Sequence, residues 1–544
     1  MTLQPALPRP HALLPDGWAA PPRRRRALGA ALTLLLLVAF DVTYGQAALY
    51  NGNQGTYLLT PLADAGLGYL DRDWMANTAD RMPATSFLVR HTVAHVGEWP
   101  LHVYQALLMG IYALALAALG AGAMRRDGAG RLWVLVALLF GGHVAQEPSV
   151  LFRGSAGQSV LFQVFEPALF GVLLVVSLAL FARSRWLAAA ACLAVSATAH
   201  PTYLLPGAII AGAYAAVLWL RDHRRGPAVG ALALYGLGVA PIAAYSLVTF
   251  APASPGLHDQ AAAILADQRI PYHADPAVWV NAMDVVRVAL VLAAAWVVRR
   301  TRLAPVLLGV LAAGVLLTVA RVVLDSRDLA LLFPWRVTVA LVPAATAILL
   351  GALVDRGFTA AVDGRPRRIR VATGLAVVAV ATATGLRMPD LIDALDGHPG
   401  RDDPLIAHVS AHKRPHDVLL LPVPDRVAEL GQWEDFRLLT GAPIYVDLKT
   451  HPLGDREVLE WWRRVQHARR LYAPGFPPCA ELRRLRASAG ITAVVVASQA
   501  AAPARCPGLV LDHRGPEWSL YRLAPVARVP LPRAAQPPRG RGPV

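Results

Sequence analysis

Acidic side chains and histidines gather in one polar segment, residues 51–100, which separates two long apolar runs. Carboxylates and imidazoles are the groups that most often transfer protons in enzymes, so this segment is the first place to look for chemistry. The motif Tyr69-Leu70-Asp71-Arg72-Asp73-Trp74 is its densest part. The alternative is a solvated loop whose acids face water. The segment carries Asp64, Asp71, Asp73, Asp80, His91, His95 and Glu98.

Three later polar segments add complementary groups. Glu147 and Arg153 follow the third apolar run, Arg269 to His273 form a cluster with Tyr272, and Arg336 ends the motif Phe333-Pro334-Trp335-Arg336. Arginine matches the oxygens of a phosphate, carboxylates bind hydroxyl groups, and aromatic faces stack on sugar rings or cations. Together these residue types suit a sugar that is linked to a phosphate.

The composition places these groups in a membrane protein. The chain has 544 residues, of which 55% are hydrophobic and 16% charged, and its mean hydropathy is +0.43. These values indicate a polytopic membrane protein rather than a soluble globule. The net charge of +16 lies largely in short basic gaps between apolar runs, which argues against a nucleic-acid partner.

The apolar runs predict about eleven transmembrane helices. Every second gap carries arginines, so residues 1–26 are expected to be cytoplasmic and to precede a retained anchor; a cleaved signal peptide is the alternative. The predicted runs are Ala27–Gly45, Leu101–Ala123, Leu132–Val144, Val160–Phe181, Trp186–Ala199, Tyr203–Leu220, Ala228–Phe250, Val280–Val298, Leu303–Leu324, Trp335–Val354 and Val371–Leu386. Residues 27–386 thus form the predicted membrane domain, an all-α polytopic bundle.

Residues 387–525 are predicted to form a small extracytoplasmic α/β domain, and residues 526–544 a disordered tail. Strands are expected at Val418–Leu421, Ile444–Val446, Thr492–Val496, Leu509–Leu511 and Ser519–Arg522. A helix is expected over Asp455–Arg470 with Asp455 as its cap. Cys479 and Cys506 are predicted to form a disulfide, since two cysteines in one domain of an oxidising compartment usually pair. The polar and aromatic segment from Phe436 to Arg464 is expected to serve recognition or structure.

Polar residues near the ends of the predicted spans concentrate on one side of the membrane. Intramembrane charge is costly and usually faces a cavity or a partner, so this distribution predicts a polar cavity that opens outward. The alternative is local pairing, of Asp284 with Arg287 and of Arg321 with Asp325. The residues are Asp41, Gln163, Glu166, His200, Asp284, Arg287, Arg321, Asp325 and Arg336.

This layout resembles the GT-C superfamily of integral-membrane glycosyltransferases, chiefly through the acidic motif Tyr69–Trp74 in a large first loop and less through Arg269–His273. The resemblance implies an inverting enzyme that moves a sugar from a polyprenyl-phosphate carrier to a glycan, lipid or protein acceptor. It implies that Asp73 or Asp71 is the base, and that a divalent metal could be held by the acidic loop. The substrate would contact Arg269, His273, Arg336, Glu147, Arg153, Trp74 and Tyr272.

Two other classes of function stay open. A transporter or flippase of lipid-linked glycan would place charges in both halves of the membrane and show inverted repeats, and neither is visible. A non-catalytic membrane scaffold would tolerate loss of Asp71 and Asp73. A metal pair at His91 and His95 is less favoured than an interfacial helix with solvated histidines.

Overall fold

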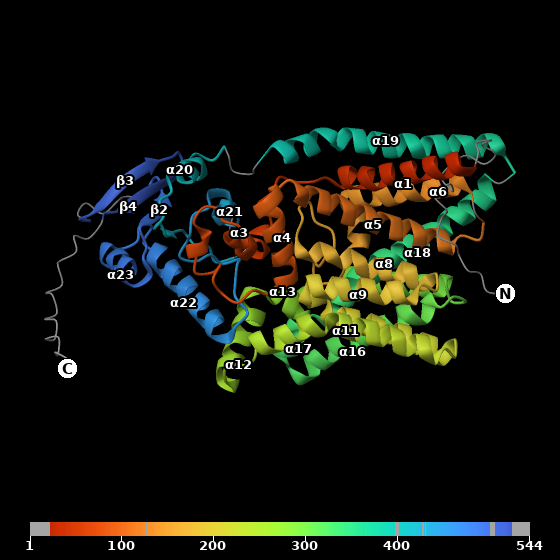
Figure 1. Cartoon of the computed structure of the whole chain (residues 1–544), viewed down its shortest axis with the longest axis horizontal. Helices are drawn as coiled ribbons and strands as arrows, with labels where there is room; N and C mark the ends of the chain where they lie inside the picture. The colour runs from red at the N-terminus through yellow and green to blue at the C-terminus, as the bar shows by residue number, and fades with distance from the viewer. Residues whose placement is uncertain are drawn as a thin grey trace, which may run out of the picture.

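The structure is a computed structural model, which describes residues 22–524 apart from 127, 363, 398–401, 427–428, 430 and 501–505. Residues 1–21 and 525–544 lie outside the described part, as do the predictions of a cytoplasmic N-terminal segment and a disordered tail. Helices dominate the fold. They form one long bundle, and the C-terminal domain sits at one end of it (Figure 1). We call this end of the bundle the domain end.

Eleven helices of the described residues overlap the eleven predicted runs. In chain order they are α1 (Pro22–Tyr44), α5 (Pro100–Ala123), α6 (Ala129–Val144), α8 (Val172–Ala182), α9 (Trp186–Ala199), α10 (Leu204–Ala216), α11 (Arg225–Thr249), α15 (Ala282–Val297), α16 (Leu303–Leu324), α18 (Thr338–Ala361) and α19 (Pro366–Asp396). The run predicted over Val160–Phe181 needs correction, because residues 160–166 are not helical and the α-helix begins only at Val172. Seven helical segments are long and apolar enough to cross a membrane, and three shorter apolar helices accompany them. The chain is therefore a multi-pass membrane protein.

The nearly unbroken apolar stretch of residues 186–220 folds as the expected pair of helices. Helix α9 ends at Ala199, and the short 3-10 helix η5 (Pro201–Tyr203) turns the chain into α10. Proline has no backbone N–H and disfavours helix in the residue before it, so His200 adopts an extended backbone. The turn places His200, Thr202 and Tyr203 at the domain end of the bundle.

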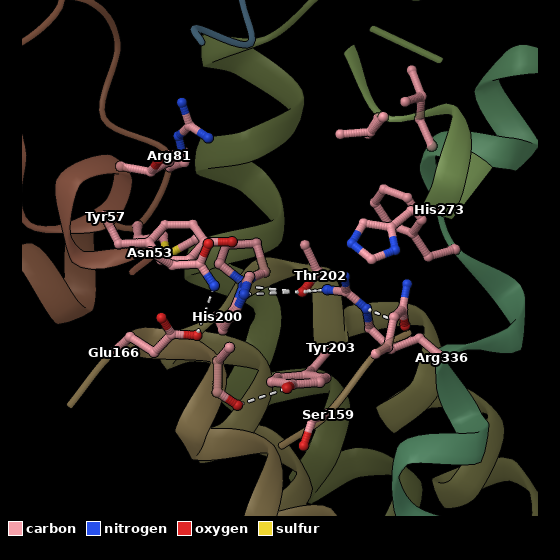
Figure 2. Close-up of a pocket in the computed structure, with 18 of the residues that line it drawn as sticks. Asn53, Tyr57, Arg81, Ser159, Glu166, His200, Thr202, Tyr203, His273 and Arg336 are labelled. Carbon is pink, nitrogen blue, oxygen red and sulfur yellow. Dashed lines mark hydrogen bonds between the residues drawn. The ribbon is translucent and has the colours of Figure 1, made fainter. Parts of the chain in front are cut away.

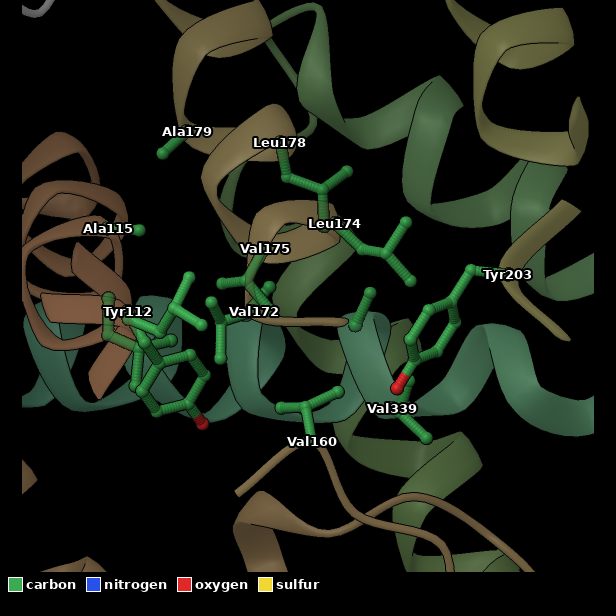
Figure 3. Packing of buried hydrophobic residues seen from close by; sticks show 14 of the residues in the cluster. Tyr112, Ala115, Val160, Val172, Leu174, Val175, Leu178, Ala179, Tyr203 and Val339 are labelled. Atoms are coloured by element: carbon green, nitrogen blue, oxygen red, sulfur yellow. The ribbon is translucent and has the colours of Figure 1, made fainter. Parts of the chain in front are cut away.

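Large aliphatic and aromatic side chains fill the centre of the bundle. Tyr112, Val172, Leu174, Val175 and Leu178 are buried there (Figure 3). Helices α5 and α18 approach so closely that a Cβ on Gly351 would overlap the backbone of Gly120. Close backbone contact between small residues is a common way to pack membrane helices.

Short helices and loops cover the domain end of the bundle. The first long connection contains α2 (Gln54–Tyr57), α3 (Leu59–Asp64), the 3-10 helix η2 (Leu70–Arg72) and α4 (Pro83–Val96). A second connection contains α12 (Pro255–Ala263), the π-helix η7 (Ile264–Arg269), α13 (Pro271–Ala274) and α14 (Pro276–Trp279). A third contains α17 (Arg327–Leu331) and the 3-10 helix η8 (Pro334–Val337). In Figure 1, α3 and α4 lie between the bundle and the C-terminal domain.

The C-terminal domain is a small α/β unit with its own hydrophobic core. Its sheet has the order β1-β2-β4-β3, with β1 parallel to β2 and the other pairs antiparallel. The strands are β1 (Leu419–Leu420), β2 (Ala493–Ala497), β3 (Leu509–Arg514) and β4 (Trp518–Leu523), and the helices α20 (Pro404–His412), α21 (Phe436–Thr440), α22 (Asp455–Tyr472) and α23 (Cys479–Ala489). The predicted fold class is confirmed.

Some details of the predicted domain need correction. Ile444–Val446 contributes only a single bridge, from Ile444 to Leu419, and is not a strand. Asp455 is not the cap of α22, because Gly454 occupies that position and the Asp455 carboxylate accepts a hydrogen bond from Ala253 N at 2.9 Å. Helix α19 continues to Asp396, ten residues beyond the predicted end at Leu386, so the domain begins later than residue 387.

The predicted disulfide between Cys479 and Cys506 is present, with the two Cα atoms 5.7 Å apart. It ties the first residue of α23 to the segment before β3. Cys192 is free and lies within the bundle on α9.

Candidate active site

A cavity of about 350 Å³ lies where the bundle, the loops of the domain end and the C-terminal domain meet. Its volume is within the range of small-molecule sites. Three arginines, three histidines and a single glutamate are the charged or imidazole side chains that line it: Arg81, Arg269, Arg336, His200, His273, His451 and Glu166. The cavity therefore combines strong positive charge with one carboxylate.

Glu166 is the only carboxylate among the lining residues and is completely buried. It directly precedes the 3-10 helix η4 (Pro167–Gly171), which leads into α8. Its Oε1 accepts a hydrogen bond from Asn53 Nδ2 at 3.3 Å, and its Oε2 has no partner among the described residues. Burial raises the pKa of Glu166 to about 8, although the Asn53 contact and the charge of Lys449 lower it. A carboxyl group with this pKa is suited to exchanging a proton near neutral pH.

Arg81 has the guanidinium that is most available to a ligand. It lines the cavity, and no hydrogen bond or ion pair within the described part of the chain engages it. Arg336 donates from Nε to Gln158 Oε1 at 3.0 Å and from Nη1 to the Thr202 hydroxyl. Since a guanidinium carries five N–H donors, Arg336 keeps three for a ligand and Arg81 keeps all five.

Arg269 is held more firmly. Its Nε and Nη2 donate to the carbonyl of Lys449 at 3.1 and 2.6 Å, and its Nη1 donates to the Tyr272 hydroxyl at 2.9 Å. Arg269 therefore lines the cavity and also joins η7 to the C-terminal domain. Three of its five N–H donors are thus occupied, so Arg269 contributes to the cavity mainly through its positive charge.

The three histidines are neutral. Burial lowers the pKa of His273 to about 4, with further lowering from Arg336, and lowers the pKa values of His200 and His451 as well. His273 Nδ1 lies 2.7 Å from the carbonyl of Ala156, so it carries the proton and donates. Figure 2 shows Glu166 and Asn53 on one side of the pocket, and Arg336 and His273 on the other.

The structure brings four of the predicted substrate contacts to this cavity or its wall. Arg269, Tyr272, His273 and Arg336 line it, although they come from separate loops. Three polar residues predicted near span ends, Glu166, His200 and Arg336, line it as well. Others pair locally instead: Arg287 Nη1 lies 2.7 Å from Asp284 Oδ1, and Arg321 Nη1 lies 3.4 Å from Asp325 Oδ1.

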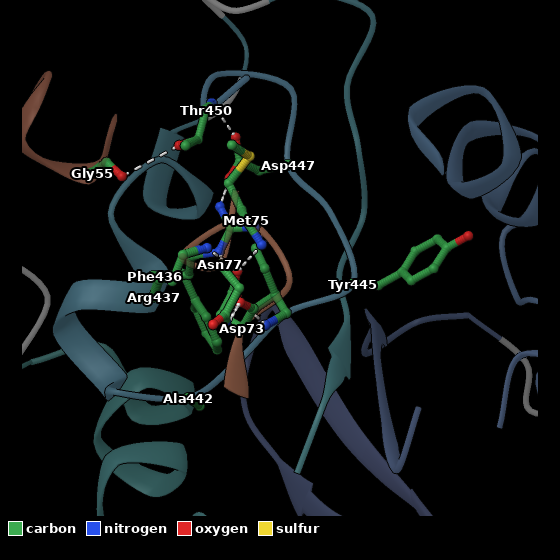
Figure 4. Close-up of polar contacts among 12 residues, drawn as sticks. Gly55, Asp73, Met75, Asn77, Phe436, Arg437, Ala442, Tyr445, Asp447 and Thr450 are labelled. Atoms are coloured by element: carbon green, nitrogen blue, oxygen red, sulfur yellow. Dashed lines mark hydrogen bonds and ion pairs between the residues drawn. The ribbon is translucent and has the colours of Figure 1, made fainter. Parts of the chain in front are cut away.

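Asp73, the preferred catalytic base, is in a different environment. It is buried away from the cavity lining, and its Oδ2 accepts hydrogen bonds from Arg437 Nε at 2.8 Å and Ile444 N at 2.9 Å. Its Oδ1 accepts from Met75 N at 2.8 Å (Figure 4). Both oxygens are occupied, so the geometry assigns Asp73 to anchoring the first loop on the C-terminal domain and leaves no access for a substrate proton.

The remaining predicted residues also lie outside the cavity lining. Asp71, Glu147 and Arg153 are exposed to solvent. Trp74 packs between the two hydrophobic cores and stacks under Arg464, whose Cζ is 4.2 Å from the ring centroid. Asp73 and Trp74 of the motif therefore join the first loop to the C-terminal domain, whereas the Asp71 side chain is exposed.

The described residues contain no group of three or more histidines, cysteines and acids with the geometry to hold a metal ion. His91 lies on α4 with its Nδ1 2.8 Å from the carbonyl of Phe87, one turn earlier. No ligand set for the expected divalent metal therefore emerges from these residues.

Sequence reasoning missed Arg81 as a cavity residue, and it placed Glu166 beside a polar cavity without assigning it a catalytic role. It considered His451 only within the segment from Phe436 to Arg464, for which a recognition or structural role is expected. Arg81 lies between acidic and apolar residues of the first loop. Nothing in this sequence pattern distinguishes it from an arginine that only faces solvent. The position of Glu166 could have indicated a function, because an acid inside an otherwise apolar run is by default a candidate functional residue. Only the fold of the C-terminal domain shows that His451 lies at the cavity.

The helical bundle with the C-terminal domain at its end is a GT-C-like fold, as the likeness to one solved structure shows. The crystal structure of ArnT from Cupriavidus metallidurans bound to undecaprenyl phosphate matches this chain with a TM-score of 0.50 and 13% identity, over 93% of this chain and 100% of that chain. At this identity the likeness establishes the fold alone.

Sequence comparisons add less. A family profile described as a domain of unknown function, DUF6798, matches residues 404–468, which run from α20 through most of α22. The comparison with curated proteins finds no match.

Proposed function

We propose that this protein is an inverting glycosyltransferase that moves a sugar from a polyprenyl-phosphate carrier to an acceptor hydroxyl. The observation that carries the proposal is the cavity, in which the single carboxylate of Glu166 shares a chamber with three arginines. The similar solved structure is of a protein bound to undecaprenyl phosphate, which supports a lipid carrier of this class.

The chain's own groups divide the reaction between them. The Glu166 carboxylate takes the proton from the acceptor hydroxyl, whose oxygen then attacks C1 of the sugar. The bond from C1 to the phosphate oxygen breaks, its electron pair stays on the phosphate, and the configuration at C1 inverts. Arg81 and Arg336 stabilise the charge that grows on the departing phosphate, with Arg269 adding its field. The separation of Glu166 from Arg336 in Figure 2 suits a base and a leaving group on opposite faces of a sugar.

The test measures binding and transfer separately. Purified protein in lipid nanodiscs should bind undecaprenyl phosphate, and Arg81→Lys should weaken that binding by about 10- to 100-fold, because lysine cannot form a bidentate contact. Glu166→Gln should keep the binding but lower transfer by about 10²- to 10⁴-fold. Transfer is read in cells without the native copy, by mass spectrometry of the envelope glycans.

The pH dependence gives a further check on Glu166. Only the carboxylate can accept a proton, and its pKa is raised to about 8, so transfer should rise as pH increases and level off above about pH 8. Glu147→Gln is the matched control, since Glu147 is an exposed glutamate outside the cavity. Normal transfer by Glu166→Gln would exclude Glu166 as the base, and absence of carrier binding in the unaltered protein would exclude the proposed function.

A further inference from the structure

The C-terminal domain closes one wall of the cavity with a single loop, residues 447–453. His451 and Leu453 of this loop line the cavity, more than 280 residues along the chain from Glu166. No other residue of the C-terminal domain is among the lining residues. This loop is therefore the domain's direct contribution to the site.

The loop is fixed from several directions. Arg437 of α21 is buried between Asp73 and Asp447, and its guanidinium pairs with both carboxylates (Figure 4). Thr450 N donates to Asp447 Oδ1 at 2.6 Å, and Trp461 Nε1 donates to the Asp447 carbonyl at 3.0 Å. Charge-assisted contacts of this kind in a buried setting hold a loop in one conformation.

The same loop is also joined to the membrane domain. Lys449 Nζ donates to the carbonyl of Gly52 at 2.8 Å, and Thr450 Oγ1 donates to the carbonyl of Gly55 at 3.3 Å. The Lys449 carbonyl accepts the two bonds from Arg269 described above. His451, which faces the cavity, is thus positioned by contacts of its loop to the first and second of the three connections that cover the domain end.

The hydrogen bonds of His451 determine what it can recognise. Its Nδ1 lies 3.2 Å from the carbonyl of Lys449, an atom that only accepts, so Nδ1 carries the proton. The ring is neutral because it is buried and faces Arg81 and Arg269, and burial is the larger cause of its lowered pKa. Nε2 then has a lone pair and no proton. It repels phosphate oxygens, which also only accept, and it requires an O–H or N–H donor.

We propose that His451 Nε2 accepts a hydrogen bond from a hydroxyl of the transferred sugar, which makes the C-terminal domain a determinant of donor specificity. The inference rests on the proposed function, since it assumes a sugar beside the arginine-bound phosphate. His273 has the same arrangement, with Nδ1 donating to the Ala156 carbonyl, and supplies a second acceptor from the opposite domain. A site that hydrogen-bonds a hydroxyl rejects analogues that lack it far more strongly than an apolar pocket would.

The experiment compares three variants in two measurements. His451→Ala should bind undecaprenyl phosphate within about twofold of the unaltered protein, because this carrier has no sugar, while transfer to envelope glycans in cells falls at least about tenfold. His451→Gln should recover part of the transfer, since the glutamine oxygen offers an acceptor near the position of Nε2. His412→Ala is the matched control, because His412 is an exposed histidine of the same domain.

Each outcome decides a separate question. Normal transfer by His451→Ala would overturn this inference and leave the proposed function intact. Loss of undecaprenyl phosphate binding by His451→Ala would also overturn it, since the residue would then serve the phosphate or the fold. Failure of the unaltered protein to bind undecaprenyl phosphate would instead overturn the proposed function, and this inference with it.

Discussion

At the scale of single residues, two carboxylates illustrate how the environment sets the role. Glu166 is buried without a cationic partner in direct contact, so its proton is held up to about pH 8 and is available for exchange. Asp73 is buried equally well but pairs with Arg437 and three backbone N–H groups. Both oxygens of Asp73 are occupied by these donors, so this carboxylate serves to anchor the first loop.

Asp73→Asn should therefore destabilise the protein rather than remove a base. The change leaves Arg437 buried with Asp447 as its remaining carboxylate, and breaking one partner of a buried ion pair costs about 3 kcal/mol. Asp71→Asn, at an exposed position two residues earlier, should change the unfolding free energy by less than about 0.5 kcal/mol. Denaturant unfolding followed by tryptophan fluorescence measures both. Full stability of Asp73→Asn together with lost transfer would restore Asp73 as the catalytic candidate.

At the scale of elements, the disulfide joins two parts of the C-terminal domain that pack on one sheet. Cys479 opens α23, Cys506 precedes β3, and 27 residues separate them. In the chain-entropy description, a loop of this length is stabilised by about 3 kcal/mol relative to the open chain. The bond thus secures the edge of the sheet that lies farthest from β1.

Replacing both Cys479 and Cys506 with serine should lower the unfolding free energy of the C-terminal domain by about 3 kcal/mol. In the unaltered native protein, a maleimide reagent without reductant should label neither cysteine, and reduction should make both reactive. Cys192 serves as the internal reference, since it stays a free thiol under both conditions. Full labelling of Cys479 and Cys506 before reduction would contradict the pairing.

At the scale of the whole molecule, the number of membrane crossings decides on which side of the membrane the cavity opens. Eleven crossings would put the segment before α1 and the C-terminal domain on opposite sides of a membrane. The C-terminal domain lies at one end of the bundle (Figure 1), and the cavity is lined by residues of that same end. The arginine clusters in alternate gaps support a cytoplasmic N-terminus. The site would then face the extracytoplasmic side.

Reporter fusions test this orientation. Alkaline phosphatase, which needs an oxidising compartment, should be active when fused after Asp396 and inactive when fused after Arg185 in the basic gap between α8 and α9. Green fluorescent protein should show the reverse pattern. Fluorescence from the fusion after Asp396 would place the C-terminal domain in the cytoplasm and overturn the proposed sidedness.

The sequence by itself determined the class of fold, because spans of membrane length and alternating arginine clusters are local properties of the chain. It also identified Arg269, Tyr272, His273 and Arg336, since polar groups beside a membrane must face a cavity or a partner. Only the tertiary structure decided which acid faces the cavity. Asp73 and Asp71 stand in a conspicuous motif, yet Arg437, 364 residues away, turns Asp73 inward, while Glu166 and His451 meet at the cavity from different domains. Burial and charge pairing between distant segments set the role of a carboxylate, and spacing along the chain does not encode them.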